Sequence, residues 1–256
     1  MPPDGLSLII PILDEHQAAS RLGDRLKSIA EQADFPLEIL LVNDGSRDAT
    51  PAHLAALDMP GLTVLHHRET KGYGAALAYG IAKATHAWIA ITDADETYPD
   101  HRIPELFAEA RRRESDMLVG ARTGTRVQDP MPRIPPKWAI RKLASFLCGS
   151  PIPDLNSGLR IMRRDMVQRY LHLMPTGMSF TSTIPLAAIA GGWQLDFVSI
   201  DYRYRTGRSK FRPLRDTANS LLLVTRAALW FPPLRGRGLP GQGDGTPHPD
   251  DATDPV

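Results

Sequence analysis

Residues 87–100, AWIAITDADETYPD, pass directly from an apolar run into a cluster of carboxylates. The run at 87–92 predicts a short buried strand, with Asp93 at its end and Asp95 two positions further on. Two carboxylates about 4 Å apart repel each other by roughly 1 kcal/mol in water and roughly 4 kcal/mol near a protein surface. The stretch is therefore either a solvated turn, in which the repulsion is small, or one side of a site that holds a positive ligand.

Outward from this strand, short apolar runs alternate with helical patterns in both directions along the chain. Buried strands are predicted at 6–12, 37–43, 62–67, 87–92 and 116–122. Helices are predicted at 16–33, from Thr50-Pro51 (N-cap and first helical residue), at 74–85 and at 104–113. This β-α-β-α-β order predicts an α/β fold, with a mainly parallel sheet covered by helices.

Polar side chains follow the predicted strands. In a parallel sheet of this kind, ligands bind outside the carboxyl ends of the strands. The residues that come just after a predicted strand are Asp14, Glu15, Asp44, Asp93, Asp95 and Arg122. We therefore expect the chemistry of the protein to gather along one rim of the sheet.

The Asp93–Asp95 pair has a metal interpretation as well as a structural one. A lone Asp-x-Asp is a weak motif, because acidic turns are common. Two carboxylates in one turn nevertheless suit Mg²⁺ or Mn²⁺, which keeps further positions for phosphate oxygens. Such an ion would hold a diphosphate and stabilise the charge that develops when a nucleoside diphosphate leaves. The neighbouring Glu96 is interpreted as solvated rather than as an outer ligand.

Asp44 and the segment 67–80 each have a binding and a packing interpretation. Asp44 would accept hydrogen bonds from a ribose or base, or would simply form an Asn-Asp-Gly turn. The segment, HRETKGYGAALAYG, lacks the GxGxxG dinucleotide fingerprint because position 77 is Leu. Gly72 and Gly74 would instead let the backbone approach a ligand near a helix N-terminus, or would allow a tight loop against its neighbours.

Three later segments are basic or mixed. ARTGTRVQDPMPRIPPKWAIRKL (121–143) suits a basic loop that receives an anionic acceptor, or an exposed loop before an amphipathic helix. DLNSGLRIMRRD (154–165) offers Asp154 as a general base or as a helix cap. YRYRTGRSKFRPLRD (202–216) would close over a diphosphate, or would form a basic surface loop.

Composition excludes several classes of protein. The net charge of +1 provides no global basic field for nucleic acid. The single cysteine, Cys148, excludes a disulfide framework and a cysteine-based zinc site. The chain has no transmembrane-length apolar stretch, and its first residues lack the basic region of a secretory signal. We therefore expect a cytoplasmic protein.

The C-terminal part differs from the rest in composition. Residues 213–234 predict an amphipathic helix that packs on the domain, or lies in a membrane interface with Trp230 and Phe231 inserted. Residues 235–256 are rich in Gly, Pro and Asp and are expected to be disordered. The expected organisation is one α/β domain over 1–212, followed by this helix and tail.

The order of the motifs is more specific than any one of them. IPILDE, ILLVNDGSRDAT, KGYGAALAYGIAKA, DADETYP, VGAR, DLNSGLR and YRTGRSKF, in this order, resemble family 2 glycosyltransferases over roughly residues 6–231. Within that family the chain resembles the dolichol-phosphate mannosyltransferase-like, polyprenyl-phosphate glycosyltransferase branch. The resemblance implies a GT-A fold, a Rossmann-like sheet with helices on both faces, together with a nucleotide-sugar donor and an inverting displacement at the anomeric carbon.

The resemblance also implies roles for individual residues. The nucleotide sugar would be bound by Pro11, Asp14, Glu15, Asp44, Lys71, Gly72, Asp93, Arg205, Ser209 and Lys210. The acceptor phosphate would be bound by Arg122, Arg126, Arg133 and Ser157. Asp93 and Asp95 would hold Mg²⁺ or Mn²⁺, and the candidate catalytic residues are Asp95, Arg122 and Asp154. Because a phosphate acceptor is already anionic, Asp154 would orient rather than deprotonate.

The expected reaction is transfer of a hexose from a UDP- or GDP-sugar to a polyprenyl phosphate at the cytoplasmic face of a membrane. A glycosyltransferase with a soluble acceptor and a non-catalytic nucleotide-sugar-binding protein stay open as alternatives. A nucleotidyltransferase would need a Gly-rich, Arg-containing loop where this chain has ILDEHQ (12–17). Residues 96–99 read Glu-Thr-Tyr-Pro where relatives usually have Leu-Gln-His-Pro. The sequence predicts no oligomeric state.

Overall fold

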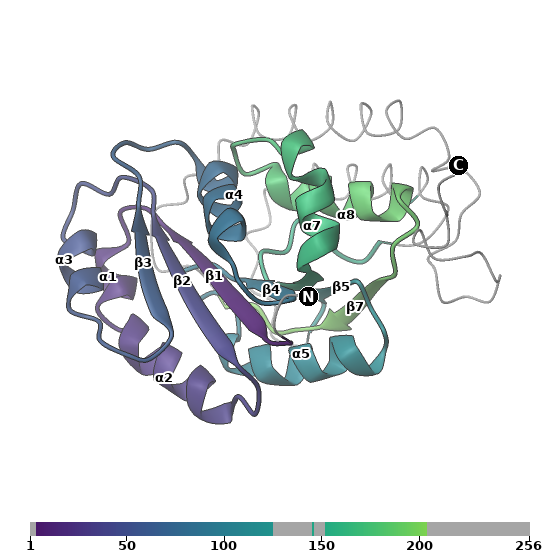
Figure 1. Ribbon diagram of the computed structural model, residues 1–256, viewed down its shortest axis with the longest axis horizontal. Helices are drawn as coiled ribbons and strands as arrows, with labels where there is room; N and C mark the ends of the chain where they lie inside the picture. Colours follow the sequence, from purple (N-terminus) through teal and green to yellow (C-terminus); the bar gives the residue numbers. More distant parts are fainter. Residues whose placement is uncertain (1–3, 125–144, 146–151, 204–256) are drawn as a thin grey trace, which may run out of the picture.

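The computed structural model describes residues 4–124, 145 and 152–203, which form an α/β fold with helices on both faces of one seven-stranded sheet (Figure 1). Some sequence-based expectations fall outside the described residues. They concern Arg126, Arg133, Arg205, Ser209, Lys210, the helix at 213–234 and the tail at 235–256. These expectations stay predictions.

The sheet has the strand order β3-β2-β1-β4-β6-β5-β7. Its strands are β1 (Leu6–Ile12), β2 (Leu37–Asn43), β3 (Leu62–His66), β4 (Trp88–Ile91), β5 (Met117–Ala121), β6 (Arg160–Arg163) and β7 (Leu195–Ser199). β6 runs antiparallel to both of its neighbours, β4 and β5, and every other pair is parallel. The five predicted strands are confirmed to within one residue at each end, and the mainly parallel sheet is confirmed with them.

The helices cover the two faces of the sheet and divide the core in two (Figure 1). One face packs on α2 (Leu22–Gln32) and α5 (Ile103–Arg112), the other on α4 (Tyr73–Lys83), α7 (Arg164–Tyr170) and α8 (Phe180–Ala190). Along β1, Leu8 and Ile10 belong to the first core and Ile9 to the second. A strand buried on both faces is apolar throughout, which explains the continuous run LSLIIPI.

The helix predicted at 16–33 is interrupted, so the prediction of one continuous helix was wrong. Two residues, Ser20 and Arg21, separate α1 (His16–Ala19) from α2 (Leu22–Gln32). The Ser20 hydroxyl donates to the carbonyl oxygen of Gln17 at 2.8 Å. A hydroxyl that bonds nearby backbone in this way competes with helical hydrogen bonding. The spacing of apolar residues along the sequence does not reveal so short a break.

α3 (Thr50–Ala55) also begins differently from the prediction. Thr50 is its first residue and not its N-cap, which is Ala49. The carboxylate of Asp48 accepts the Thr50 N–H at 2.9 Å, and so takes the capping role. The Thr50 hydroxyl instead accepts the Glu15 N–H at 3.0 Å, which ties the helix to the loop after β1.

The remaining helices complete the covering layers. The helices predicted at 74–85 and 104–113 are present as α4 and α5. Two single 3₁₀ turns, η1 (Asp100–Arg102) and η3 (Leu171–Leu173), precede α5 and follow α7. Among the described residues, none of the helices combines the length and the apolar character needed to cross a bilayer.

Candidate active site

The turn at 93–95 follows β4 and is clamped to the body of the domain. Ala94, between the two aspartates, is 4% exposed. Arg25 of α2 donates from Nη1 to the Ala94 carbonyl oxygen at 2.8 Å and forms an ion pair with Asp100. The Thr92 hydroxyl donates to the same Asp100 carboxylate at 2.8 Å. A turn held by a buried ion pair does not fit the interpretation of a freely solvated acidic loop.

The two carboxylates of the turn are half-buried and are oriented by hydroxyl groups. Asp93 Oδ1 accepts the Tyr73 hydroxyl at 2.9 Å, and Asp95 Oδ1 accepts the Thr97 hydroxyl at 2.7 Å. Burial and the adjacent charge of Asp93 raise the pKa of Tyr73 well above its ordinary value, so the phenol keeps its proton and donates. Fixed carboxylate oxygens of this kind suit Mg²⁺ or Mn²⁺.

The surroundings of this turn bear on how many side chains could hold a metal ion. Within residues 4–124, 145 and 152–203, no three His, Cys, Asp or Glu side chains come together as a metal site. The Glu96 carboxylate accepts two hydrogen bonds from Arg21, at 2.9 and 3.1 Å, and these lower the pKa of Glu96. The interpretation of Glu96 as simply solvated was therefore incomplete.

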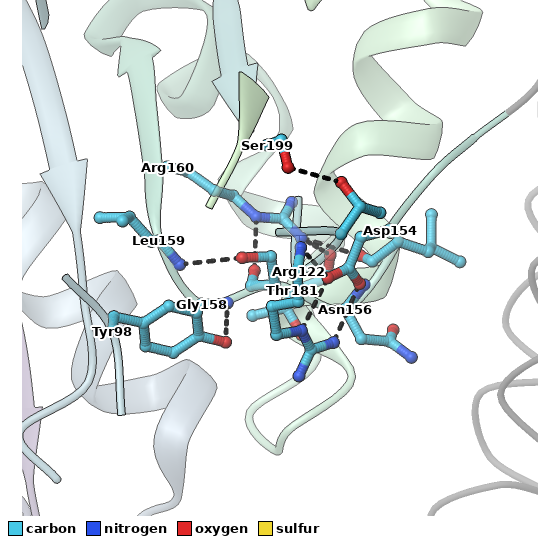
Figure 2. Close-up of polar contacts among 12 residues, drawn as sticks. Tyr98, Arg122, Asp154, Asn156, Gly158, Leu159, Arg160, Thr181 and Ser199 are labelled. Atoms are coloured by element: carbon cyan, nitrogen blue, oxygen red, sulfur yellow. Dashed lines mark hydrogen bonds and ion pairs between the residues drawn. The ribbon is translucent and has the colours of Figure 1, made fainter. Parts of the chain in front are cut away.

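Gly158 closes the other side of the Asp93 carboxylate. A Cβ atom at position 158 would lie 2.9 Å from Asp93 Oδ2 and 3.1 Å from Oδ1, so a side chain here would force the Asp93 carboxylate to move. The Gly158 N–H donates to the Tyr98 hydroxyl at 2.7 Å, as Figure 2 shows. Asp93 is thus held between the Tyr73 hydroxyl and the backbone at Gly158.

Arg122 and Asp154 form a forked ion pair after β5, in which the two side chains are 13% and 11% exposed (Figure 2). Nε of Arg122 donates to Asp154 Oδ2 at 2.6 Å, and Nη2 donates to Oδ1 at 2.9 Å. The Arg122 backbone N–H donates to Oδ2 as well, at 3.1 Å. The guanidinium carbon lies 5.1 Å from the centre of the Tyr202 ring. These contacts fix the arginine next to the turn that bears the two aspartates.

This ion pair bears on the predicted role of Asp154. Burial opposes its ionisation, but the hydrogen bonds and the charge of Arg122 outweigh burial and lower the pKa of Asp154. A carboxylate held in this way is a weak general base. The geometry therefore favours the orienting role over deprotonation, and the helix-cap interpretation does not apply because β6 follows this loop.

Asp44 organises the loop between β3 and α4. Its carboxylate accepts the backbone N–H groups of Lys71 at 2.9 Å and Gly72 at 2.8 Å, and it pairs with His67 Nδ1 at 2.7 Å. The side chain is 4% exposed. The interpretation of Asp44 as a residue of a local Asn-Asp-Gly turn is therefore incomplete, because Asp44 also fixes the loop at 67–72. Contact with a nucleoside stays a prediction.

The glycines of this loop serve close packing. Gly72 has a φ of 107°, and a Cβ there would lie 2.6 Å from the Thr176 carbonyl oxygen. A Cβ on Gly74 would collide with the Pro175 carbonyl oxygen. The same Thr176 oxygen accepts the Ala75 N–H at 3.0 Å. Of the two interpretations, the structure shows the tight loop against a neighbouring segment.

The predicted nucleoside residues at the end of β1 and just after it lie on the same side of the sheet as Asp44. Pro11 is buried opposite Val42 of β2. Asp14 is exposed with a φ of 46°, and its carboxylate accepts the Arg47 N–H at 2.8 Å. Glu15 is tied through its N–H to α3, as described above. These residues come together as predicted, while their contact with a nucleotide is untested.

Ser157 was predicted to bind the acceptor phosphate. It is fully buried, and its hydroxyl accepts the Leu159 N–H at 3.3 Å. This burial does not favour direct contact with an acceptor.

Four residues of the site were missed by sequence reasoning. They are Arg25, Tyr73, Tyr98 and Arg160. Tyr73, Tyr98 and Arg160 stand inside motifs already recognised, KGYG, DADETYP and DLNSGLR, and a polar side chain inside a site motif was an available signal. Arg25 stands on a predicted helix without any motif, so no local signal marked it.

Comparison with known proteins places the chain in a family. The sequence profile described as Glycosyl transferase family 2 matches residues 7–171. A dolichyl-phosphate hexose transferase of Haloferax volcanii is 30% identical over 212 residues, which are 82% of this chain and 88% of that protein. A dodecaprenyl-phosphate galacturonate synthase of Rhizobium johnstonii is 30% identical over 167 residues, 64% of this chain and 49% of that protein. The chain spans about half the length of several such relatives.

Solved structures confirm the fold. Glucosyl-3-phosphoglycerate synthase from Mycobacterium tuberculosis, in complex with Mn²⁺, UDP and phosphoglyceric acid, superposes with a TM-score of 0.66 at 16% identity. The superposition covers 89% of this chain and 78% of that one. The expected GT-A architecture is thereby confirmed. The chain is a glycosyltransferase that belongs to glycosyl transferase family 2, and its likeness is to the branch of polyprenyl-phosphate sugar transferases.

Proposed function

We propose that this enzyme transfers a hexose from a UDP- or GDP-sugar to a polyprenyl phosphate, with inversion and with Mg²⁺ or Mn²⁺ at Asp93 and Asp95. One observation carries the proposal. A fixed two-carboxylate turn and a forked Arg122–Asp154 pair stand together at the carboxyl ends of the central strands. Relatives named for dolichyl- and dodecaprenyl-phosphate products support a lipid-phosphate acceptor.

The donor would lie along the rim formed by the loops after β1, β2 and β3. Asp44 fixes the loop at 67–72 by accepting the N–H groups of Lys71 and Gly72, and Asp14 contacts Ser46 of the loop after β2. Tyr73 and Thr97 fix the carboxylates of Asp93 and Asp95, toward which the donor diphosphate would point. A divalent ion bound there would offset the charge of the departing nucleoside diphosphate.

The acceptor would approach from the side of Arg122. A phosphate is anionic at neutral pH, so its attack on the anomeric carbon in line with the leaving diphosphate needs no strong base. Asp154 then serves to hold the Arg122 guanidinium, which suits forked hydrogen bonding to phosphate oxygens. Fixing the two reactants in this way supplies much of the rate enhancement expected of such a site.

Membrane contact forms part of the proposal. Polyprenyl phosphate is confined to a bilayer, so the enzyme must reach the membrane surface. We assign that contact to the amphipathic segment at 213–234, on the cytoplasmic face, from its sequence pattern alone.

A transfer assay tests the proposal. The purified chain is incubated with radiolabelled UDP- or GDP-hexoses, Mn²⁺ and liposomes that contain polyprenyl phosphate, or with soluble sugar and glycerate phosphates. We expect metal-dependent label in the lipid phase, and an inverted anomeric configuration by NMR. Label found only in soluble products would establish the soluble-acceptor alternative. Donor binding with neither transfer nor hydrolysis would establish the non-catalytic alternative.

A further inference from the structure

Arg160 follows the loop that carries Asp154 and Gly158, and Figure 2 shows its contacts with that loop. Its side chain is 0% exposed. Its Nε donates to the Ser157 carbonyl oxygen at 2.9 Å. Its Nη2 donates to the carbonyl oxygens of Leu155 at 2.8 Å and Thr181 at 2.5 Å. One guanidinium therefore joins two points of the loop to the first turn of α8.

The partners of this guanidinium are unusual for a buried cation. In the part of the chain that the structure describes, its hydrogen bonds go to backbone carbonyl oxygens and to the Met117 sulfur at 4.0 Å, and the Asp154 carboxylate acts on it through its charge alone. Burial lowers the pKa of Arg160 to about 10, so the group stays charged at neutral pH. An apolar side chain of similar volume would fill the space without the loss of hydration. Packing alone therefore does not account for an arginine here.

The bonds to carbonyl oxygens determine where the next peptide lies. With the carbonyls of Leu155 and Ser157 turned toward Arg160, the Gly158 N–H faces the Tyr98 hydroxyl at 2.7 Å. The Gly158 Cα then faces the Asp93 carboxylate, with no room for a side chain between them. The position of Asp93 thus depends on a backbone that Arg160 holds.

A second contact ties the same loop to α8. The Ser182 hydroxyl donates to Asn156 Oδ1 at 2.5 Å, one residue along the helix from the Thr181 carbonyl that Arg160 binds. The loop is thus anchored on α8 at two adjacent residues.

We propose that Arg160 is a positioning residue, which fixes the backbone of residues 155–158 and through Gly158 sets the Asp93 carboxylate in the geometry that its ligand requires. The proposal rests on the proposed function in one respect, the use of Asp93 to bind a cation with the donor diphosphate. Arg160 itself touches no reacting atom.

Four variants test the proposal. Arg160→Lys keeps the charge but cannot reach both ends of the loop, and Arg160→Met removes the charge. Gly158→Ala displaces Asp93 directly, by the methyl group that has no room there. The matched control is Arg163→Lys, on the same strand but pairing with Asp165 at the surface. Cooperative thermal unfolding establishes that each variant is folded, and Arg160→Lys serves if Arg160→Met does not fold.

The primary readout is Mn²⁺ affinity, measured by electron paramagnetic resonance without donor or acceptor. Arg160→Lys and Gly158→Ala should each weaken Mn²⁺ binding by about 10-fold or more, as expected when a group supporting a metal ligand is lost. The double variant Arg160→Lys/Gly158→Ala should bind Mn²⁺ no more weakly than the weaker-binding single variant, because both substitutions act through Asp93. In turnover, each should lower kcat by about 10², the effect expected of an ångström-scale displacement, while acceptor KM changes little.

The outcomes separate the two proposals. Folded Arg160→Lys with wild-type Mn²⁺ affinity and kcat, or fully additive effects in the double variant, would overturn the positioning role. Wild-type protein that binds Mn²⁺ but transfers no hexose to polyprenyl phosphate would overturn the proposed function, and the Mn²⁺ measurement would still decide the role of Arg160. If the wild type binds no Mn²⁺, a crystal structure of Arg160→Lys decides it. A displacement of Gly158 relative to Asp93 in that variant would support the positioning role of Arg160. An unchanged position of Gly158 would overturn that role.

Discussion

The proposed donor rim, formed by the loops after β1, β2 and β3, and the Asp93 turn both present carboxylates near the ends of strands, but these carboxylates are held in different ways. On the donor rim, Asp44 and Asp48 accept hydrogen bonds mainly from backbone N–H groups, and each also pairs with one histidine ring, His67 or His16. At the turn after β4 the supports are charged or phenolic side chains from distant segments, such as Arg25 and Tyr73. The rim is largely a matter of loop conformation, whereas the turn is assembled by tertiary packing.

This difference predicts how each region responds to substitution. Loss of one backbone-to-carboxylate bond on the rim alters a loop and leaves its neighbours in place. At the turn after β4 and the neighbouring Arg122–Asp154 pair, loss of one partner leaves an uncompensated charge, or moves a carboxylate that must be precisely placed for catalysis. Four substitutions probe the comparison, in order of decreasing expected effect.

Removing Arg122 should have the largest effect on stability. Arg122→Met leaves the largely buried Asp154 carboxylate without its partner and should lower the free energy of unfolding by about 3 to 5 kcal/mol. Urea denaturation measures the change. The double variant Arg122→Met/Asp154→Leu, which buries no charge, should recover most of the loss. If the single variant lost less than about 1 kcal/mol, this pair would be no tighter than a surface ion pair.

Removing one charge of the turn should mainly affect turnover. Asp95→Asn should lower kcat by at least about 10², the order found when one key electrostatic group of an active site is lost. Its unfolding midpoint should change little, because Thr97 can still donate to the amide oxygen. Asp24→Asn, at an exposed position of α2, is the control for charge alone. Near-normal turnover by folded Asp95→Asn would contradict the assignment of this turn.

On the donor rim, Asp44→Asn should have an intermediate effect. An amide there faces N–H donors of Lys71 and Gly72 with an N–H group of its own, and should cost about 1 to 3 kcal/mol of stability. Chemical denaturation gives the magnitude, and hydrogen exchange should show faster opening at 67–72 only. Faster exchange across β4 and β6 as well would show that the two regions are not independent.

The smallest effect should be a pH dependence at Asp48. Burial raises its pKa, but hydrogen bonds from Thr50 and His16 outweigh burial and lower the pKa from 3.8 to about 2. The folded-state pKa is the lower one, so the stabilisation is complete only above about pH 5 and is lost as the pH falls toward 2. Because this side chain is partly exposed, we expect the stabilisation of the folded state by the Asp48 carboxylate to be about 1 kcal/mol.

Asp48→Asn removes this titration. The difference in unfolding free energy between the wild type and Asp48→Asn should therefore shrink between pH 5 and pH 2. A difference that stays constant over that range would show that the Asp48 carboxylate has an ordinary pKa.

The same contrast explains what could be predicted from the sequence. The strands of the parallel part of the sheet, such as β1 and β2, were predicted to within one residue of their observed ends. The reason is that strands buried on both faces are continuous apolar runs. The carboxylates of the rim follow those strands directly, so their positions came with them. The family resemblance, which depends on local motifs in order, found the same residues.

The missed features are those that only tertiary packing creates. β6 is four residues long with an arginine at each end, which is no strand pattern, and α8 is buried all round and so lacks an amphipathic period. An arginine such as Arg160 is expected at a surface, and nothing local indicates that carbonyl oxygens of two segments enclose it. The break after α1 was missed because it is shorter than a helical turn.

A thermal-shift titration with nucleotide sugars tests the central claim most directly, since a ligand that binds the folded protein raises Tm by mass action. UDP- and GDP-hexoses are titrated with and without Mn²⁺, into the wild type and Asp95→Asn. We predict that one donor class raises the Tm of the wild type only when Mn²⁺ is present, and that Asp95→Asn loses the shift. A shift of equal size without metal, or one that Asp95→Asn retains in full, would contradict the claim that the turn after β4 binds the donor through a divalent ion.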